Sequence, residues 1–367
     1  MRIQTVKTSS DFNKFIKFPW SIYKDDENWV PPLLFDIKFV LNKSPFWEHA
    51  QKELFLAIDD DEQVIGRIAG IVDRHYIEFQ GENVGFFGFF ECINNRETAE
   101  LLFNTVKHWL KSKNIDKMYG PMNPSTNDEC GFLCEGFDSS PVLMMPYNPD
   151  YYLELAQDCG LKKKKELYAY DINVEEAPMD RLAKLARIIY KKNPGLSIRP
   201  MNLKDFKNEI EKTIEVYNQA WEKNWGFVPW TKKEFHTMAS RMKDLINPKF
   251  AVLAEINGKP IGIKLSIPDY NIITKELNGR LFPFGFLKIL LGKNKIKSTR
   301  TMIVGVIKDY RNKGIEGLMY YEAFKNAKAY GLKRGEFSWI LDDNILTQRS
   351  CESMGGVLYK KYRVYEN

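Results

Sequence analysis

The apolar positions along the chain change between helical and strand spacing in a regular order, which predicts an α/β protein. In the stretch 96–113, Leu102, Val106 and Leu110 recur at helical spacing and predict an amphipathic helix. The runs FLAI and VIGRIAGIV flank an acidic turn at 59–63 and predict a hairpin. The elements expected in the first half are a strand at 2–7, helices at 10–23 and 33–41, the hairpin, a strand at 84–91, the helix at 96–113, a strand near 118, a helix at 149–158 and a strand at 166–173.

The same order of elements returns from Ser197 onward. Its hairpin, at 250–267, contains Asn257-Gly258, a dipeptide that favours the tight turn between two antiparallel strands. The other elements expected in this half are a strand at 197–202, helices at 203–221 and 231–245, a strand at 301–307, a helix at 314–330, a strand at 336–340, a helix at 344–354 and a strand at 359–366.

Glycine positions support a duplication. Gly66, Gly88 and Gly160 correspond in order to Gly262, Gly305 and Gly355. Gly88 and Gly305 lie further apart in the sequence than the members of the other two pairs, which places an insertion between the third and fourth strands of the second copy. Chance similarity between two α/β patterns is the alternative, but the shared order of elements favours duplication. We therefore expect an N-terminal domain at 1–173, a linker with one helix at 174–199 and a C-terminal domain at 200–367.

Composition is that of a folded globular protein and excludes several classes. At 367 residues the chain is long enough for two domains, and 44% of its residues are hydrophobic. The net charge is +6, but the basic residues are spread along the chain. They favour an anionic partner only weakly and form no stripe typical of nucleic-acid binding.

Cysteine and histidine spacing argues against a metal site. The five cysteines and four histidines show no ligand spacing and no pairing pattern. No signal peptide is recognised, so we expect a cytoplasmic protein. The longest apolar run, Leu281–Leu291, is interrupted by Pro283, Gly285 and Lys288, so no transmembrane segment is expected.

The stretch 302–321 carries the most specific chemistry. A buried strand leads into Tyr310–Gly314 and a helix begins at once, so unpaired backbone N–H groups and basic side chains would form an anion site. This stretch resembles the pyrophosphate loop of the GNAT superfamily of N-acetyltransferases, a strand followed by R/Q-x-x-G-x-G/A and a helix. Arg311 and Gly314 match that motif, but Glu316 stands where a small residue is expected, and Gly317 lies one place late.

A second motif follows the next strand. Asn344 to Gly355 keeps the spacing of the superfamily's N-x-x-A-x-x-L-Y-x-x-x-G helix, with Thr347 and Ser350 as small substitutes. In that superfamily the Asn and the Tyr lie near the cofactor, and the Tyr often protonates the departing thiolate. Cys351 replaces the Tyr here. A cysteine could donate that proton, but packing as a small apolar residue is the favoured interpretation.

The resemblance extends over nearly the whole chain and implies two tandem GNAT-like folds. The chain is also similar to an uncharacterised bacterial family of tandem acetyltransferase-like proteins, through PFWEHA, GFFGFFE, GPMNPSTNDE, YNQAWEKNWGFVP and SWILDDN. In the first copy the loop at 92–97 has no glycine, so that copy is expected to hold no cofactor. The resemblance implies that the second copy binds acetyl-CoA or another acyl-CoA through Val304, Gly305, Val306, Arg311, Asn312, Lys313, Gly314, Ile315, Glu316, Gly317 and Asn344.

Two clusters are candidates for the acceptor site, and each has a structural alternative. The first falls where two helices of the second copy meet; core packing explains its tryptophans equally well. The second is a polar loop, which turn chemistry explains equally well. The candidate acceptor residues are Tyr217, Asn218, Trp221, Asn224, Trp225, Phe227, Asn123, Ser125 and Asn127.

The leading hypothesis is an N-acyltransferase that moves an acyl group from acyl-CoA to an amine. The strand backbone at 304–306 would polarise the carbonyl, and Asp342 or Asp343 could accept a proton, although a helix N-cap is the favoured role for that pair. Two alternatives remain open: a transferase of the same fold that uses aminoacyl-tRNA, and a non-catalytic ligand-binding or interaction protein. The apolar and basic insert at 281–300 is expected to be a lid over the acceptor, with peripheral membrane contact as its rival.

Overall fold

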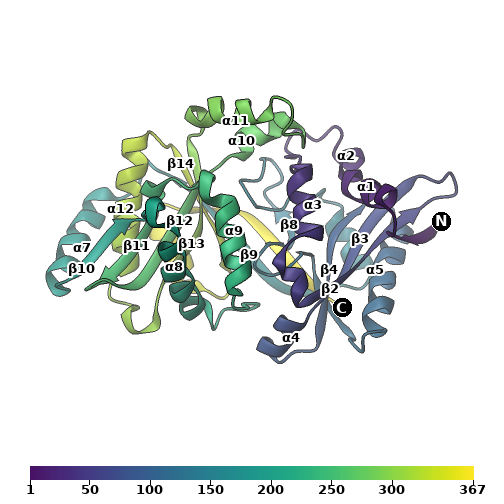
Figure 1. Ribbon diagram of the computed structural model, residues 1–367, viewed down its shortest axis with the longest axis horizontal. Coiled ribbons are helices and arrows are strands. Elements are labelled where there is room, and N and C mark those ends of the chain that lie inside the picture. Colours follow the sequence, from purple (N-terminus) through teal and green to yellow (C-terminus); the bar gives the residue numbers. More distant parts are fainter. The chain divides into compact units, whose positions relative to one another are not determined.

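The computed structural model describes residues 1–367 and divides into two compact units (Figure 1). The first unit comprises residues 1–167, 273–289 and 360–367. The second comprises residues 168–272 and 290–359. Each unit combines a sheet of mainly antiparallel strands with helices, so the predicted α/β class is confirmed.

The first unit follows the expected order of elements. Pro19 separates the two helices that the sequence pattern predicts as a single stretch, because a proline has no N–H for the helical ladder. Its elements are β1 (Arg2–Thr5), α1 (Ser9–Lys17), α2 (Pro19–Ile22), α3 (Leu34–Asn42), β2 (Ala50–Ile58), β3 (Val64–Asp73), α4 (Arg74–Gln80), β4 (Val84–Cys92), α5 (Arg96–Lys111), β5 (Lys117–Gly120), β6 (Met122–Asn123), β7 (Glu129–Cys130), β8 (Phe132–Glu135) and α6 (Tyr152–Asp158).

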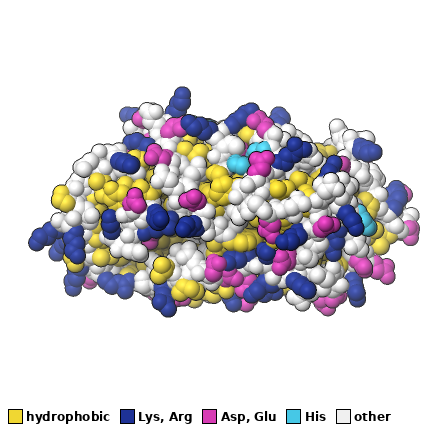
Figure 2. All heavy atoms as spheres, turned by 90° about the horizontal axis from the view of Figure 1, so that it is seen from below, with side chains coloured by type: hydrophobic (Ala, Val, Ile, Leu, Met, Phe, Trp, Pro, Cys, Tyr) yellow, Lys and Arg dark blue, Asp and Glu magenta, His cyan; other side chains and the backbone are white.

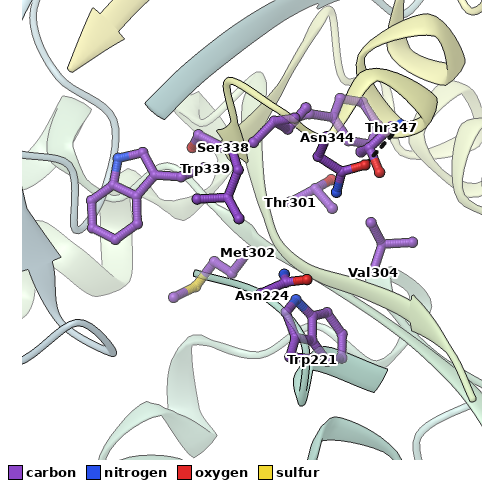
Figure 3. Close-up of a pocket in the computed structure, with 12 residues that line it drawn as sticks. Trp221, Asn224, Thr301, Met302, Val304, Ser338, Trp339, Asn344 and Thr347 are labelled. Atoms are coloured by element: carbon purple, nitrogen blue, oxygen red, sulfur yellow. Dashed lines mark hydrogen bonds between the residues drawn. The ribbon is translucent and has the colours of Figure 1, made fainter. Parts of the chain in front are cut away.

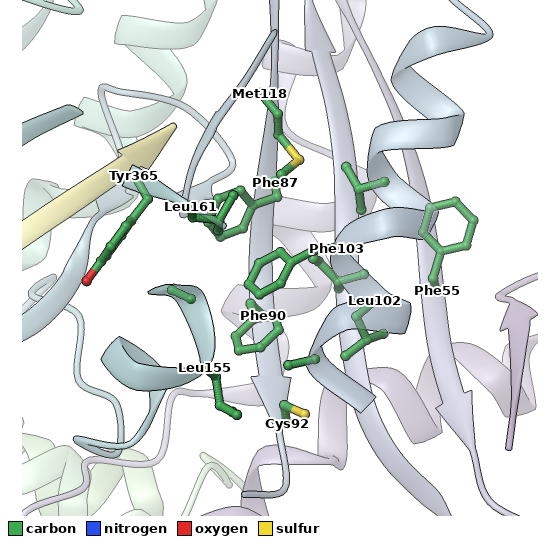
Figure 4. Packing of buried hydrophobic residues seen from close by; sticks show 14 of the residues in the cluster. Phe55, Phe87, Phe90, Cys92, Leu102, Phe103, Met118, Leu155, Leu161 and Tyr365 are labelled. Carbon is green, nitrogen blue, oxygen red and sulfur yellow. The ribbon is translucent and has the colours of Figure 1, made fainter. Parts of the chain in front are cut away.

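The sheet of the first unit has the strand order β1-β2-β3-β4-β5 and continues into the end of β15 (Val357–Glu366). Neighbouring strands are antiparallel except β4 and β5, which pair in parallel over Val84–Phe86 and Lys117–Tyr119. Helix α5 packs on this sheet around a core rich in phenylalanine (Figure 4). Phe87 and Phe90 of β4, Phe103 of α5 and Tyr365 of β15 meet in this core.

The second unit repeats this plan. Its elements are β9 (Lys162–Asn173, shared with the first unit), α7 (Met179–Lys192), β10 (Leu196–Pro200), α8 (Phe206–Trp221), α9 (Lys232–Met242), β11 (Ala251–Ile256), β12 (Lys259–Pro268), β13 (Ser298–Val306), α12 (Ile315–Tyr330), β14 (Arg334–Leu341) and α13 (Ile345–Ser353). The helices between β12 and β13, α10 (Asn271–Thr274) and α11 (Gly285–Gly292), lie partly in residues 273–289 of the first unit. Its strand order is β9-β14-β13-β12-β11-β10, and β13 and β14 form the parallel pair.

Helices cover both faces of the second sheet. Trp221 of α8 packs against the Cα of Gly305, whereas the neighbouring Val304 packs with Tyr320 of α12. Because successive residues of a strand point to opposite faces, α8 and α12 lie on opposite faces of the sheet. Both faces are therefore buried, and a polar side chain on either face is held inside the protein.

The unit boundaries differ from the predicted domain limits at the linker helix, at residues 273–289, which belong to the first unit, and at the end of the chain. The predicted linker helix is α7, which packs on α12 inside the second unit. The last residues of the chain belong to the first unit, because Tyr365 pairs with Gly120 of β5 and Arg363 pairs with Phe132 of β8. No helix is long and apolar enough to cross a membrane.

Candidate functional site

The parallel strands β13 and β14 diverge halfway along their length. They pair from Ser298 and Arg334 to Thr301 and Phe337, and the pairing stops there although both strands continue. A β-bulge lies at this point: Ser266 and Leu265 of β12 pair with Thr301 and Ile303, so Met302 is the extra residue. The edge of β13 from Met302 to Val306 therefore faces a gap rather than a neighbouring strand.

A cavity of about 80 Å³ fills this gap (Figure 3). Its volume matches two or three water molecules, which is room for reacting groups rather than for a whole substrate. Side chains from β13, β14, the end of α8 and the start of α13 surround it. The residues that line it are Trp221, Asn224, Thr301, Met302, Val304, Phe337, Ser338, Trp339, Ile340, Leu341, Asn344 and Thr347.

Trp221 of the predicted acceptor cluster forms an aromatic wall of the cavity, whereas Tyr217 and Phe227 are not among the lining residues. The ring of Trp221 stacks on Tyr217 with centroids 4.7 Å apart, and Phe227 lies 5.8 Å from Tyr217. Trp221 also approaches Gly305 so closely that a Cβ there would lie 2.5 Å from its ring. The glycine therefore lets the indole reach the gap between the strands.

The other members of this cluster lie behind or beside the wall. Asn224 lines the cavity, whereas Trp225 is half-buried and is not among the lining residues. Asn218 on α8 has a buried side-chain oxygen without a hydrogen-bond partner. A buried acceptor of this kind is costly unless something donates to it, so Asn218 is a candidate contact for a polar ligand.

The loop after β13 holds its basic residues in two different ways. The Arg311 guanidinium donates to the carbonyl of Val306 at 3.1 Å and to that of Ala220 at 2.7 Å. These hydrogen bonds connect the end of β13 to α8. Lys313 is exposed, with its ammonium 4.7 Å from the ring centre of Tyr310, and Asn312 is also exposed. Arg311 thus braces the loop, and Lys313 remains open to an anion.

Helix α12 begins with uncapped N–H groups. Its N-cap, Gly314, has a φ of 80° and offers no side chain to the first turn. A left-handed residue at this point favours glycine, and the free N–H groups together with the helix dipole favour a bound anion. Ile315 is buried in the core, whereas Glu316 keeps an exposed surface, although neighbouring atoms desolvate its carboxyl and raise its pKa.

Helix α7 covers the two glycines of this loop. A Cβ on Gly314 would lie 2.6 Å from the side chain of Ile189, and one on Gly317 would lie 2.9 Å from that of Leu185. The space that these two glycines leave open is therefore occupied by side chains of α7, a helix of the same unit. The sequence motif predicts a small residue here but does not reveal which group approaches it.

Helix α13 places one predicted residue in the cavity and leaves three outside it. Asn344 lines the cavity, and its side-chain oxygen accepts the N–H of Thr347 at 3.2 Å as the N-cap of the helix. Asp342 and Asp343 are not among the lining residues. Cys351 is buried with the core of α12 and α13, and burial raises the pKa of its thiol to about 12.

The predicted polar loop of the first unit is occupied by its own hydrogen bonds. The Asn123 side chain accepts the N–H of Phe89 at 2.6 Å. The Ser125 hydroxyl donates to Asp128 at 2.6 Å and accepts the N–H of Asn127 at 3.1 Å. These bonds are the turn chemistry that the sequence offers as the alternative.

Lys264 is a residue that the sequence interpretation missed. It lies on β12 opposite Val304, and its side chain is only 3% exposed. Its ammonium donates to Ser266 at 2.5 Å and to Thr301 at 3.3 Å, and Thr301 lines the cavity. No carboxylate pairs with it, so burial lowers the pKa of Lys264 from 10.5 to about 7. The local sequence carries no signal for this burial, because Gly262, Lys264 and Ser266 alternate with apolar residues as on a solvent-facing side of a strand.

The residues present fit the reactive end of an acyl-CoA. The unpaired edge of β13 offers backbone groups to a thioester, and the cavity with Asn344 gives it space beside Trp221. The uncapped start of α12 and Lys313 offer positive potential to the diphosphate. The contacts of α7 with Gly314 and Gly317 leave the backbone of that helix less accessible than its sequence implies.

Solved structures of GNAT proteins have the same fold. A tandem GNAT protein from the clavulanic acid biosynthesis pathway aligns over 100% of this chain and 98% of its own, with a TM-score of 0.60 and 8% identity. The GCN5-related glucosamine N-acetyltransferase region of a fungal β-N-acetylglucosaminidase aligns over 100% of this chain and 38% of its own, with a TM-score of 0.59 and 12% identity. The prediction of two tandem GNAT-like folds is thereby confirmed.

Two curated proteins match the chain over nearly their whole length, although no family model matches it. Protein YghO of Escherichia coli is 33% identical over 372 residues, which cover 99% of this chain and 94% of YghO. The bacterial ceramide synthase of Caulobacter vibrioides is 31% identical over 370 residues, which cover 98% of this chain and 96% of that protein. The chain therefore belongs to the family of tandem GNAT-fold proteins that includes YghO and this bacterial ceramide synthase.

Proposed function

We propose that the second unit is an N-acyltransferase that transfers an acyl group from acyl-CoA to the nitrogen of an amine. The observation that carries this proposal is the gap between β13 and β14, where unpaired backbone, a cavity and a buried lysine meet. Acyl-CoA supplies an activated thioester there. The edge of β13 from Met302 to Val306 orients its carbonyl and stabilises the negative charge that develops on the oxygen.

Lys264 accepts the proton that the amine must lose. An amine is mostly protonated at neutral pH and must become neutral before it can attack a carbonyl carbon. The hydroxyls of Thr301 and Ser266, 2.8 Å apart, connect the cavity to the Lys264 nitrogen. One proton of the ammonium passes along these hydroxyls to neutral Lys264, and the free amine attacks the carbonyl carbon. As the C–N bond forms and the C–S bond breaks, the nitrogen loses a second proton, which neutralises the departing thiolate.

A long-chain amine is the acceptor class that we favour. A ceramide is the amide of a long-chain amine and a fatty acid, so the name of the Caulobacter relative describes formation of an amide bond. The ring of Trp221, which lines the cavity and stacks on Tyr217, suits an acceptor whose amine is attached to an apolar chain. A cavity of about 80 Å³ holds the reacting groups only, so the acyl chain of the donor and the apolar chain of the amine must both extend beyond it.

Release of free thiol from acyl-CoA tests this proposal. The purified chain is incubated with acetyl-CoA or palmitoyl-CoA and a panel of amines that includes sphinganine, and the product is identified by mass spectrometry. We expect amide product with the long-chain amine and at least a hundred-fold loss in the variant Lys264→Met. Lys259→Met, on the same strand but exposed, is the control. Amide formation at an unchanged rate without Lys264 would contradict the assigned proton acceptor.

The second candidate is a protein that binds a ligand and does not turn it over. It is favoured by one observation: the side chains of Ile189 and Leu185 take the space beside Gly314 and Gly317. This candidate predicts that calorimetry detects no acyl-CoA binding, or binding without thiol release for any amine. Shortening both α7 side chains with Ile189→Ala and Leu185→Ala would then leave turnover absent, whereas the acyltransferase would gain affinity for the coenzyme.

A further inference from the structure

The insert between α10 and β13 exposes an unusual number of large apolar side chains. Phe282 and Leu291 are each 80% exposed, and Phe284 is 69% exposed. Phe286, Leu287 and Leu290 are also exposed. Scattered apolar side chains are normal on a protein surface, but a contiguous set of six marks a site of interaction.

These side chains lie on one face of a short helix and on the loop before it. In α11 (Gly285–Gly292), Phe286, Leu287, Leu290 and Leu291 occupy positions i, i+1, i+4 and i+5, which share a face. Phe282 and Phe284 precede this helix directly. We name these six residues the apolar face of the insert.

The base of the insert is fixed to the first unit. The Asn278 side chain accepts the indole N–H of Trp20 at 2.6 Å, and the carbonyl of Gly279 accepts the N–H of Leu34 at 3.0 Å. Gly279 has a φ of 76°, and a Cβ there would lie 2.5 Å from the Trp20 ring. The insert is thus held at its base while its apolar face points into solvent.

Positive charge surrounds the apolar face. Arg280 precedes it, Lys288 lies within α11, and Lys293, Lys295 and Lys297 follow it, all of them exposed. The sequence contains no Asp or Glu from residue 281 to residue 308. An apolar face with a cationic border is complementary to a membrane whose surface carries negative charge and whose interior is apolar.

We propose that the apolar face of the insert docks the protein on an anionic lipid bilayer. The apolar side chains enter the interfacial region, and the lysines contact the lipid phosphates. The sequence pattern favours a lid over the acceptor, but a lid would bury these side chains in the protein, and Phe282 and Leu291 are among the most exposed large apolar residues of the chain. Docking would give the proposed acyltransferase access to long-chain substrates. The evidence for docking comes from the insert alone and does not depend on the proposed activity.

Co-sedimentation with vesicles tests docking without any substrate. The full chain is mixed with vesicles of phosphatidylcholine alone and with vesicles that also contain phosphatidylglycerol. We expect binding to the anionic vesicles, weakened by high salt, and at least a ten-fold loss of affinity in the double variant Phe282→Ser with Phe284→Ser. The matched control is Ile188→Ser with Val357→Ser, two apolar residues that are 51% and 66% exposed elsewhere.

Each other outcome overturns the proposal. Equal binding of the test and control variants would show that this face is not the contact. Absence of binding to either vesicle, together with a concentration-dependent dimer on size exclusion that Phe282→Ser abolishes, would assign the face to a second copy of the chain. Thiol release in detergent-free buffer is measured in parallel, so that a failed docking result is separated from a failed acyltransferase.

Discussion

The two units share one plan but treat the gap between their diverging parallel strands in opposite ways. In the first unit β4 and β5 stop pairing after Phe86 and Tyr119, and the chain itself closes the gap. A Cβ on Gly88 would lie 1.8 Å from the carbonyl oxygen of Met122, and the Asn123 side chain binds the N–H of Phe89. In the second unit the equivalent gap, beyond Thr301 and Phe337, contains a cavity of about 80 Å³.

The helices that follow β4 and β13 also differ between the two units, and only the second of them leaves its start open to a ligand. Helix α5 is capped by Asn95, whose side chain accepts the N–H of Thr98 at 2.8 Å, and it carries Glu97 in its first turn. Helix α12 has Gly314 as its N-cap and no side-chain bond. The first helix thus satisfies its own N–H groups and repels an anion, and the second leaves its N–H groups for a ligand.

Among the buried cations of the two units, Arg67 and Lys264 have different surroundings. Arg67 of the first unit lies 3.4 Å from Glu91, which accepts hydrogen bonds from Tyr23 and Tyr152 at 2.9 and 2.7 Å. Lys264 of the second unit has only hydroxyl partners. Removal of one partner of a buried ion pair leaves the other charge uncompensated and is strongly destabilising. An unpaired buried cation instead has an altered proton affinity, which is common at catalytic sites. These differences support the proposal that the site lies in the second unit.

Neutral replacement of the two buried cations should give the largest contrast. Lys264→Met removes an unpaired ammonium and should stabilise the fold by about 1–4 kcal/mol while lowering turnover at least a hundred-fold. Arg67→Met leaves the Glu91 carboxylate uncompensated and should destabilise by about 3–5 kcal/mol. Urea unfolding and thiol release measure both effects. Destabilisation by Lys264→Met with normal turnover would make Lys264 a structural residue.

The two corresponding glycines should separate stability from activity. Gly88→Ala places a methyl group against a backbone carbonyl that cannot move, and should cost about 3 kcal/mol or more. Gly305→Ala meets the ring of Trp221, which can turn, and should cost about 1 kcal/mol but weaken acyl-CoA binding about ten-fold. Thermal unfolding and calorimetry distinguish them. Equal losses of stability in the two variants would contradict the view that the gap is closed in the first unit and open in the second.

The pH dependence should follow Lys264 in a defined direction. Because its pKa falls from 10.5 to about 7 on folding, the unfolded chain binds the extra proton between these two values. The contribution of Lys264 to the free energy of unfolding should therefore rise with pH from about 7 to 10.5, and Lys264→Met should flatten that rise. Turnover should increase as pH rises through about 7, where Lys264 becomes neutral. A pH–rate profile without this limb would contradict its role.

Changes at the two helix starts should have the smallest effects. Asn95→Ala removes the cap of α5 and should cost about 1 kcal/mol without affecting acyl-CoA binding. Glu316→Gln removes one exposed negative charge beside the start of α12 and should tighten binding by about two-fold to five-fold, because solvent screens that charge. Calorimetry at low and high salt measures the second effect. A salt-independent gain would point to a direct contact of Glu316 with the ligand.

The fold was largely predictable because its elements are strongly periodic and repeat. The strand before Tyr310, the helix after Gly314 and the cluster around Trp221 all lie where the sequence pattern places them. The insert was located correctly, but its exposure could not be predicted, since an apolar run suits a buried helix equally well.

The residues that were not predicted depend on contacts between distant parts of the chain. Gly262, Lys264 and Ser266 alternate with apolar residues, a pattern typical of a solvent-facing side of a strand. Lys264 is buried because α12 covers that face, and nothing local to β12 indicates this. The packing of Ile189 against Gly314, and the return of Tyr365 to the first unit, depend on long-range packing in the same way.

The central claim is that one unit carries a ligand site and the other does not. Titration calorimetry with a non-reactive thioether analogue of palmitoyl-CoA tests it most directly, with Asn224→Trp filling the cavity and Glu222→Trp as the exposed control on the same loop. We expect one analogue per chain, no binding to Asn224→Trp and unchanged binding to Glu222→Trp. Two analogues per chain, or full binding to Asn224→Trp, would contradict the assignment of the site to the second unit.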